Sequence, residues 1–315
     1  MRRFLAPLAL SAALSGPAWG ATPPPAGAPE RPAALQVAST TTDLKALVEE
    51  VGGERVKVES LAGATHDPHA IEIKPGQIAR LKRSALLVRI GLDHEPWLAR
   101  AVATAGEARL APGGPGDLDV SKTIALLQSE TPRLRADRRA HVHAFGNPHY
   151  WLDPENARAI TAAILERLAR LRPEERAAFA ANRDRFLARL DAGLARWKRA
   201  LAPYRGERAV VVHESWPYFA ERFGLSIVAA IEPTPGVPPT PATLAGLAQR
   251  MKASGVRLII AEPYSDASLV RQVAGRTGAR VAVLVPSVGA DPAAGDYLAL
   301  FDLNVKRLAA ALAPQ

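Results

Sequence analysis

Cysteine is absent from the 315-residue chain, methionine occurs only twice, and aromatic residues make up only 5% of it. Without thiols the chain can form no disulfide framework, no cysteine-ligated metal site and no N-terminal cysteine that carries a lipid. Any metal site must therefore take its ligands from histidine, aspartate, glutamate or water.

Long hydrophobic runs are also missing. The apolar run from Phe4 to Leu14 follows Met1-Arg2-Arg3 and precedes the small residues that end at Ala21, a pattern typical of a secretory signal peptide. We expect residues 1–20 to be that signal peptide, residues 21–34 to be a Pro/Ala-rich flexible tether, and the mature protein to be periplasmic. Because no apolar run of about 18 residues follows, we expect the protein not to be embedded in the membrane.

The net charge of +9 is spread along the chain rather than gathered in one segment. Basic residues between Arg183 and Arg199 are interleaved with acidic ones, as on a solvated helix face, so we expect no nucleic-acid binding. A chain with 48% hydrophobic and 23% charged residues is typical of globular proteins, and its length suits two domains.

Short apolar runs alternate with helix-like segments from Leu35 onward, which predicts parallel strands joined by crossover helices. The strands predicted in the first half are 35–39, 56–61, 85–90 and 108–110. The alternation resumes at Arg208, so we predict an N-terminal α/β lobe over 35–171 and a C-terminal α/β lobe over 204–315. Each lobe should hold a mostly parallel four-stranded sheet flanked by helices.

A long helix is predicted between these lobes, within residues 172–203. It opens at Pro173 and carries apolar residues at spacings of three and four until Pro203 ends it. At about 1.5 Å per residue it would be roughly 40 Å long. It is either a rigid connector between the lobes or an ordinary helix packed on one of them.

Histidines occur where the predicted strands end. His66 and His69 follow the second strand, His94 follows the third, and His213 directly follows the apolar segment 209–212. His149 precedes a helix start at Asp153-Pro154, within a stretch that also holds His141 and His143. Ligands of open α/β sheets bind at the carboxyl ends of the strands, and neutral imidazole is a common metal ligand.

The motifs around these histidines bring in a known family. They are Asp67-Pro68-His69 with Lys74-Pro75, Gly91-Leu92-Asp93-His94-Glu95-Pro96-Trp97-Leu98, Asn147-Pro148-His149-Tyr150-Trp151-Leu152-Asp153-Pro154, His213-Glu214-Ser215-Trp216-Pro217 and Ala261-Glu262-Pro263. In this order and spacing the chain resembles the metal-binding proteins of ABC importers, the zinc and manganese binders of the cluster A-I class (solute-binding protein family 9).

The resemblance implies two lobes joined by one long rigid helix and a metal ion in the cleft between them. Carried over motif by motif, the metal ligands are His69, His149 and His213. Manganese-type members usually have a carboxylate at the third position, and three imidazoles suit Zn²⁺ better than Mn²⁺. The resemblance thus implies a monomeric carrier, not an enzyme, that brings Zn²⁺ to an ABC transporter permease.

The chain departs from the family pattern at the position of the fourth metal ligand. Many members have an aspartate where this chain has Val285. Candidates for a fourth ligand or a supporting role are Glu262 and His66. Water is a further candidate for the fourth ligand. His94 is expected to pack behind the ligands or support them. His141 and His143 stand where relatives have a metal-gathering loop, and they either capture metal or are simple loop residues.

Two alternatives stay open. The same fold would serve with manganese, iron or copper as cargo, and Cu²⁺ outbinds Zn²⁺ at most nitrogen sites. Three histidines with one open position also occur in zinc hydrolases.

Overall fold

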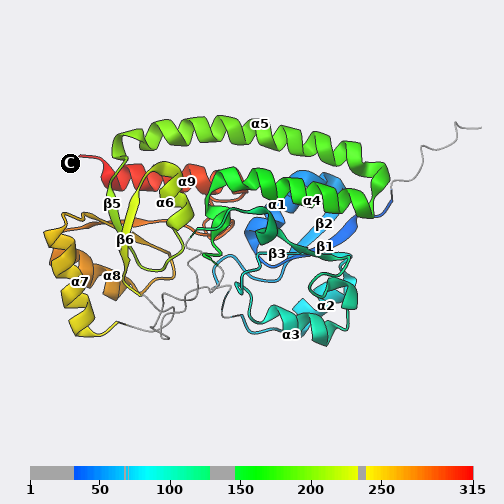
Figure 1. Ribbon diagram of the computed structural model, residues 1–315, viewed down its shortest axis with the longest axis horizontal. Coiled ribbons are helices and arrows are strands. Elements are labelled where there is room, and N and C mark those ends of the chain that lie inside the picture. Colours follow the sequence, from blue (N-terminus) through cyan, green and yellow to red (C-terminus); the bar gives the residue numbers. More distant parts are fainter. Residues whose placement is uncertain (1–31, 67–68, 70, 128–145, 233–238, 315) are drawn as a thin grey trace, which may run out of the picture. The chain divides into compact units, whose positions relative to one another are not determined.

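Two parallel four-stranded sheets form the centre of the fold in the computed structural model (Figure 1). The structure describes residues 32–66, 69, 71–127, 146–232 and 239–314, so the predicted signal peptide, His141 and His143 lie outside the described residues. The strands are β1 Leu35–Ser39, β2 Val56–Ser60, β3 Leu86–Arg89, β4 Asp117–Asp119, β5 Arg208–Val211, β6 Ser226–Ala230, β7 Leu258–Ala261 and β8 Arg280–Val283. They are ordered β2-β1-β3-β4 in the N-terminal lobe and β6-β5-β7-β8 in the C-terminal lobe, so the two sheets share one topology.

Helices connect and cover these strands. They are α1 Thr42–Gly52, α2 Pro75–Arg83, α3 Leu98–Ala105, α4 Ala157–Leu171, α5 Arg176–Leu201, α6 Pro217–Phe223, α7 Pro241–Ala253, α8 Ala267–Thr277 and α9 Tyr297–Leu312. All strand pairs in both sheets are parallel, which confirms the predicted α/β fold class.

Alternate residues of the central strands face opposite hydrophobic layers. Val37 of β1 and Val211 of β5 belong to one continuous buried cluster that includes residues of α1, α4, α5 and α9. Ala38 faces a separate cluster with α2 and α3, and Val210 faces another with α7 and α8. Burial on both faces explains why these strands are apolar throughout. Each lobe therefore has a helix layer of its own, and both share the third.

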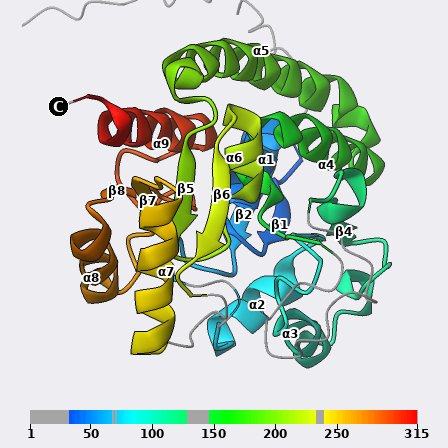
Figure 2. The ribbon, with the colours of Figure 1, turned by 60° about the vertical axis from the view of Figure 1, so that its left-hand side comes forward.

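Helix α5 is the longest helix in the layer that both lobes share. It contacts α1 and α4 of the N-terminal lobe and α9 of the C-terminal lobe, and Figures 1 and 2 show it running past both sheets. Its buried residues include Phe186, Leu190 and Trp197, at the spacings that predicted the helix. The predicted long helix is present, and it packs against both lobes.

One predicted strand was wrong. Residues Ala108–Leu110 form a 3-10 turn, and the fourth strand is Asp117–Asp119. Hydrophobicity does not mark this strand, because two of its three residues are aspartates. Its position is fixed by pairing with β3 and by Arg89, whose guanidinium lies 2.7 Å from Asp117 and 3.1 Å from Asp119.

Hydrogen bonds also cross between the lobes. The Arg222 guanidinium on α6 donates to both carboxylate oxygens of Asp153, each at 2.7 Å. The Trp151 indole donates to the Pro286 carbonyl at 2.9 Å, and the Tyr297 hydroxyl donates to the Trp151 carbonyl at 2.6 Å. These contacts hold the segment after His149 against the C-terminal lobe.

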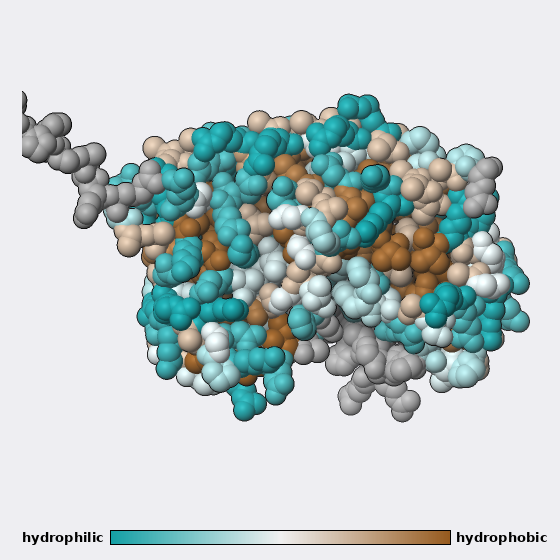
Figure 3. Space-filling view, turned by 180° about the vertical axis from the view of Figure 1, so that it is seen from behind, coloured by the Kyte–Doolittle hydropathy of each residue, from teal (hydrophilic) through white to brown (hydrophobic). Residues whose placement is uncertain are grey.

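Polar residues cover most of the face drawn in Figure 3, and hydrophobic residues form separate smaller patches on it. Among the described residues, no helix is both long and apolar enough to cross a membrane.

Candidate metal site

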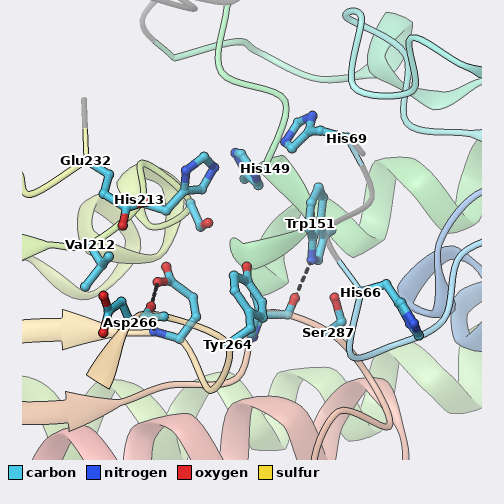
Figure 4. A pocket seen from close by; sticks show the side chains of 14 residues that line it. His66, His69, His149, Trp151, Val212, His213, Glu232, Tyr264, Asp266 and Ser287 are labelled. Atoms are coloured by element: carbon cyan, nitrogen blue, oxygen red, sulfur yellow. Dashed lines mark hydrogen bonds between the residues drawn. The ribbon is translucent and has the colours of Figure 1, made fainter. Parts of the chain in front are cut away.

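Three imidazoles from distant parts of the chain meet beside the carboxyl ends of the two sheets. His69 lies between β2 and α2, His149 lies directly before the 3-10 turn Tyr150–Leu152, and His213 follows β5 after Val212. One nitrogen of each falls within 4.8 Å of the other two. Their ring centroids are 5.4 to 6.1 Å apart, and Figure 4 shows them side by side. An ion about 2.0–2.1 Å from each nitrogen would draw them slightly closer.

His149 is oriented by Asn147. The Asn147 side-chain oxygen lies 3.0 Å from His149 Nδ1 and accepts the His149 backbone N–H at 2.9 Å. Because an amide oxygen only accepts, Nδ1 must carry the proton, so Nε2 is the nitrogen whose lone pair can bind a metal. The Asn147 amide nitrogen donates to the Glu214 carbonyl at 2.9 Å, which fixes which way the amide points. The orientation of an N-terminal-lobe histidine therefore depends on a C-terminal-lobe backbone atom.

His213 is held by the sheet that precedes it. The Val212 N–H donates to the Ile260 carbonyl at 2.9 Å, which continues the parallel ladder one residue beyond β5. The Ser215 N–H then donates a hydrogen bond to the His213 carbonyl at 2.8 Å, which closes a tight turn. A strand end followed by a tight turn places this imidazole in the lining of the pocket.

The pocket itself has a volume of about 160 Å³. Its acidic lining residues, among those the structure describes, are Glu232, Glu262 and Asp266, and all belong to the C-terminal lobe. Burial, with the nearby Asp266 charge as a second cause, raises the pKa of Glu232 above its usual value. Carboxylates on this wall favour the approach of a cation.

Glu262 lies in the pocket wall but outside the group of three imidazoles. It is buried, and its two carboxylate oxygens accept hydrogen bonds from the Trp216 indole at 2.7 Å and the Ser265 hydroxyl at 2.8 Å. Burial raises its pKa from 4.5 to about 7, although both hydrogen bonds lower it. This arrangement ties the end of β7 to Trp216, the residue directly before α6, and engages both Glu262 carboxylate oxygens.

The other candidates take different positions. His66 is exposed, and in Figure 4 it lies well apart from the three imidazoles. Val285 is fully buried in the shared hydrophobic cluster, with its backbone N–H and carbonyl bound to the Asn304 amide at 2.8 and 2.7 Å. His94 is fully buried beside His69 and does not line the pocket.

Sequence reasoning missed Asn147 and Trp151 as parts of this site. Asn147 orients His149, and Trp151 lies 5.2 Å from the ring centroids of both His149 and His94. Both residues stand in the Asn-Pro-His-Tyr-Trp motif, so the motif itself was the available signal.

Comparison with known proteins points to one family. The family model described as ZnuA, "Zinc-uptake complex component A periplasmic", matches residues 37–311. The chain is 29% identical over 309 residues to the high-affinity zinc uptake system protein ZnuA of Paracoccus denitrificans, which covers 85% of this chain and 90% of that protein.

Solved structures give the same result. A crystal structure of ZnuA is 26% identical, with a TM-score of 0.73 over 89% of this chain and 100% of that one. A zinc-bound deletion mutant of ZnuA is likewise 26% identical, with a TM-score of 0.72 over 90% of this chain and 99% of that one. Since the family model spans nearly all of the described residues, the chain belongs to the ZnuA family of periplasmic zinc-uptake components.

Proposed function

We propose that the protein binds one Zn²⁺ ion between its two lobes through His69, His149 and His213, and delivers it to the permease of an ABC importer. The observation that carries the proposal is the convergence of three imidazole nitrogens within 4.8 Å, two from one lobe and one from the other. Water is the simplest fourth ligand, because both Glu262 oxygens are engaged and Val285 offers none.

Zinc is the favoured cargo for two reasons. Three nitrogen donors suit Zn²⁺ better than the hard Mn²⁺ ion, which prefers oxygen. The relative named as a zinc uptake protein covers 85% of this chain, and the zinc-bound ZnuA structure covers 90% of it. Copper also binds imidazole well, so the metal content of protein taken from its native compartment distinguishes the two. The family relation decides against the hydrolase alternative.

Several further expectations belong to this proposal. We propose a monomer that is exported with residues 1–20 as a cleaved signal peptide and that keeps residues 21–34 as a flexible Pro/Ala-rich tether. We also keep the domain boundaries at 35–171, 172–203 and 204–315. His141 and His143, outside the described residues, remain candidates for a capture loop.

Release requires the ion to lose ligands from one lobe. The Asp153–Arg222 pair and the Trp151–Pro286 hydrogen bond resist separation of the lobes, and α5 packs on both. We therefore expect only a small change of shape between metal-free and zinc-bound protein. Nearly superimposable small-angle scattering curves would agree with this, whereas a wide opening would contradict it.

The site is tested by zinc titration against a competing chelator. Replacing His69, His149 or His213 with Ala should each weaken binding steeply. His66→Ala should have little effect, because His66 is exposed and stands apart. Unchanged affinity in all three ligand variants would refute the ligand assignment.

A further inference from the structure

A fourth imidazole, that of His94, lies beside the proposed ligands on the side away from the pocket. Its ring centroid is 4.3 Å from that of His69 and 5.5 Å from that of His149, and it is fully buried. His213 lines the pocket and His94 does not. The His69–His149 pair is therefore flanked by one imidazole from each lobe.

The spacing of the rings suits a metal ion on either side of this pair. Two imidazoles that bind one zinc ion have ring centres about 5 Å apart, since each nitrogen lies about 2.0–2.1 Å from the metal. The distances from the His94 ring to the rings of His69 and His149 lie on either side of that value. The distances from the His213 ring to the same two rings are 6.1 and 5.4 Å. The His94 nitrogens fall outside the group that lies within 4.8 Å, so its ring must rotate to bind.

The backbone before His94 is forced into an unusual shape. Gly91, Leu92 and Asp93 have φ angles of 79°, 56° and 56°, in the left-handed region that side chains other than glycine rarely adopt. A Cβ on Gly91 would stand 2.3 Å from an Asp119 carboxylate oxygen. Such strained segments persist where the surroundings impose them, and they gather at functional sites.

Buried contacts impose this shape. The Glu95 carboxylate accepts the backbone N–H groups of Ile90 at 2.7 Å and Gly91 at 3.1 Å. The Tyr150 hydroxyl donates to the Ile90 carbonyl, which links the loop to the residue next to His149. The position of His94 is therefore set by the same N-terminal-lobe framework that positions a proposed ligand.

We propose that His94, His69 and His149 form a second nitrogen site within the N-terminal lobe, to which the ion passes when His213 withdraws. The inference rests on the proposed zinc-binding function. It makes release a stepwise exchange, in which one imidazole replaces another before the ion leaves.

X-ray absorption of zinc-loaded His213→Ala tests the exchange without touching the buried loop. Outer-shell scattering from imidazole rings should indicate three imidazoles in this variant, as in the wild-type protein. Two imidazoles with added oxygen ligands in His213→Ala would overturn the inference. Failure of the wild-type protein to hold zinc at all would instead refute the proposed function.

A second experiment replaces His94 with leucine, which has a similar bulk and no nitrogen. Chelator competition should show a change of only a few fold for His94→Leu alone, and at least about a tenfold further loss when it is added to His213→Ala. Equal effects of His94→Leu in the wild-type protein and in His213→Ala would overturn the inference. Circular dichroism and thermal melting of each variant confirm that the fold is retained.

Discussion

The two lobes share a topology but bring different chemistry to the pocket. The N-terminal lobe contributes the imidazoles of His69 and His149. The C-terminal lobe contributes His213 together with the carboxylates of Glu232 and Asp266. Two of the three proposed nitrogen ligands therefore lie on one wall, the nitrogen wall. The third lies with Glu232, Glu262 and Asp266 on the other, the acidic wall.

The difference arises from how each lobe uses its strand ends. In the C-terminal lobe the pocket residues stand at or just past the strands, as His213 does after β5 and Glu262 after β7. In the N-terminal lobe His149 comes from a segment beyond the sheet, which Asn147 fixes to the other lobe. The nitrogen wall therefore depends on contacts between lobes, whereas the acidic wall depends on its own sheet.

The largest expected effect is the loss of a nitrogen ligand. The binding free energy of Zn²⁺ at a structural site with four ligands is about 10–16 kcal/mol. One ligand therefore corresponds to roughly a hundredfold or more in zinc affinity. His149→Ala should reach this loss. The loss for His213→Ala should also be steep but smaller, because in the proposed second site His94 takes the place of His213. Zinc titration with a competing chelator measures both. A larger loss for His213→Ala would reverse the comparison of the two walls.

The next effect concerns the acidic wall. Burial raises the pKa of Glu262 from 4.5 to about 7, so the folded chain holds this proton more tightly than the unfolded chain does. The stability that the proton provides is present at low pH and is lost as the pH rises from 4.5 through about 7. Its size is on the order of 3 kcal/mol.

Replacing Glu262 with Gln keeps the shape of the protonated acid and removes the titration. Urea unfolding of the metal-free protein between pH 5 and pH 8 should show a flatter pH dependence for Glu262→Gln than for the wild-type protein. Burial also raises the pKa of Asp43 and Glu95 to about 7, so part of the slope will remain. Identical slopes would show that Glu262 does not titrate in this range.

The sequence predicted the sheets and the C-terminal wall because both follow local rules. Apolar segments predict buried parallel strands, and the residue after such a strand must lie at the ligand-binding edge. His213 and Glu262 are both of this kind. Strand β4 was missed, since the ion pairs of Arg89 stabilise it rather than an apolar pattern.

The sequence could not predict the details that depend on contacts between distant residues. The side chain of Asn147 reaches the Glu214 carbonyl, 67 positions away, and this contact sets the His149 proton. The close approach of His94 to His69 depends on a left-handed turn of three residues. Motif resemblance indicated His69 and His149, but only the folded chain shows what orients them.

A smaller effect is expected from Asn147. Asn147→Leu removes the acceptor that holds the proton on His149 Nδ1, so the ring can adopt the other tautomer and turn away from the ion. Loss of such a partner typically lowers metal affinity about 10–100-fold. The affinity of Asn147→Leu should fall within this range, as measured by chelator competition. Asn182→Leu is the matched control, because the Asn182 amide donates to the Val51 carbonyl and does not line the pocket. Unchanged affinity would mean that His149 is oriented by packing against Trp151 alone.

The smallest effect is expected from the contact between the lobes that Arg222 makes with Asp153, outside both walls of the pocket. Arg222→Met keeps most of the side-chain bulk but leaves the Asp153 carboxylate without its two charged hydrogen bonds. Because Asp153 is mostly buried and Arg222 is partly exposed, we expect a loss of about 1–2 kcal/mol in the free energy of unfolding. Urea unfolding measures this loss, and a double-mutant cycle with Asp153→Asn isolates the pair. Zinc affinity should fall only slightly in Arg222→Met, since α5 still holds both lobes. A zinc affinity as low as that of His149→Ala would instead show that this ion pair, and not the shared helix layer, positions the nitrogen wall.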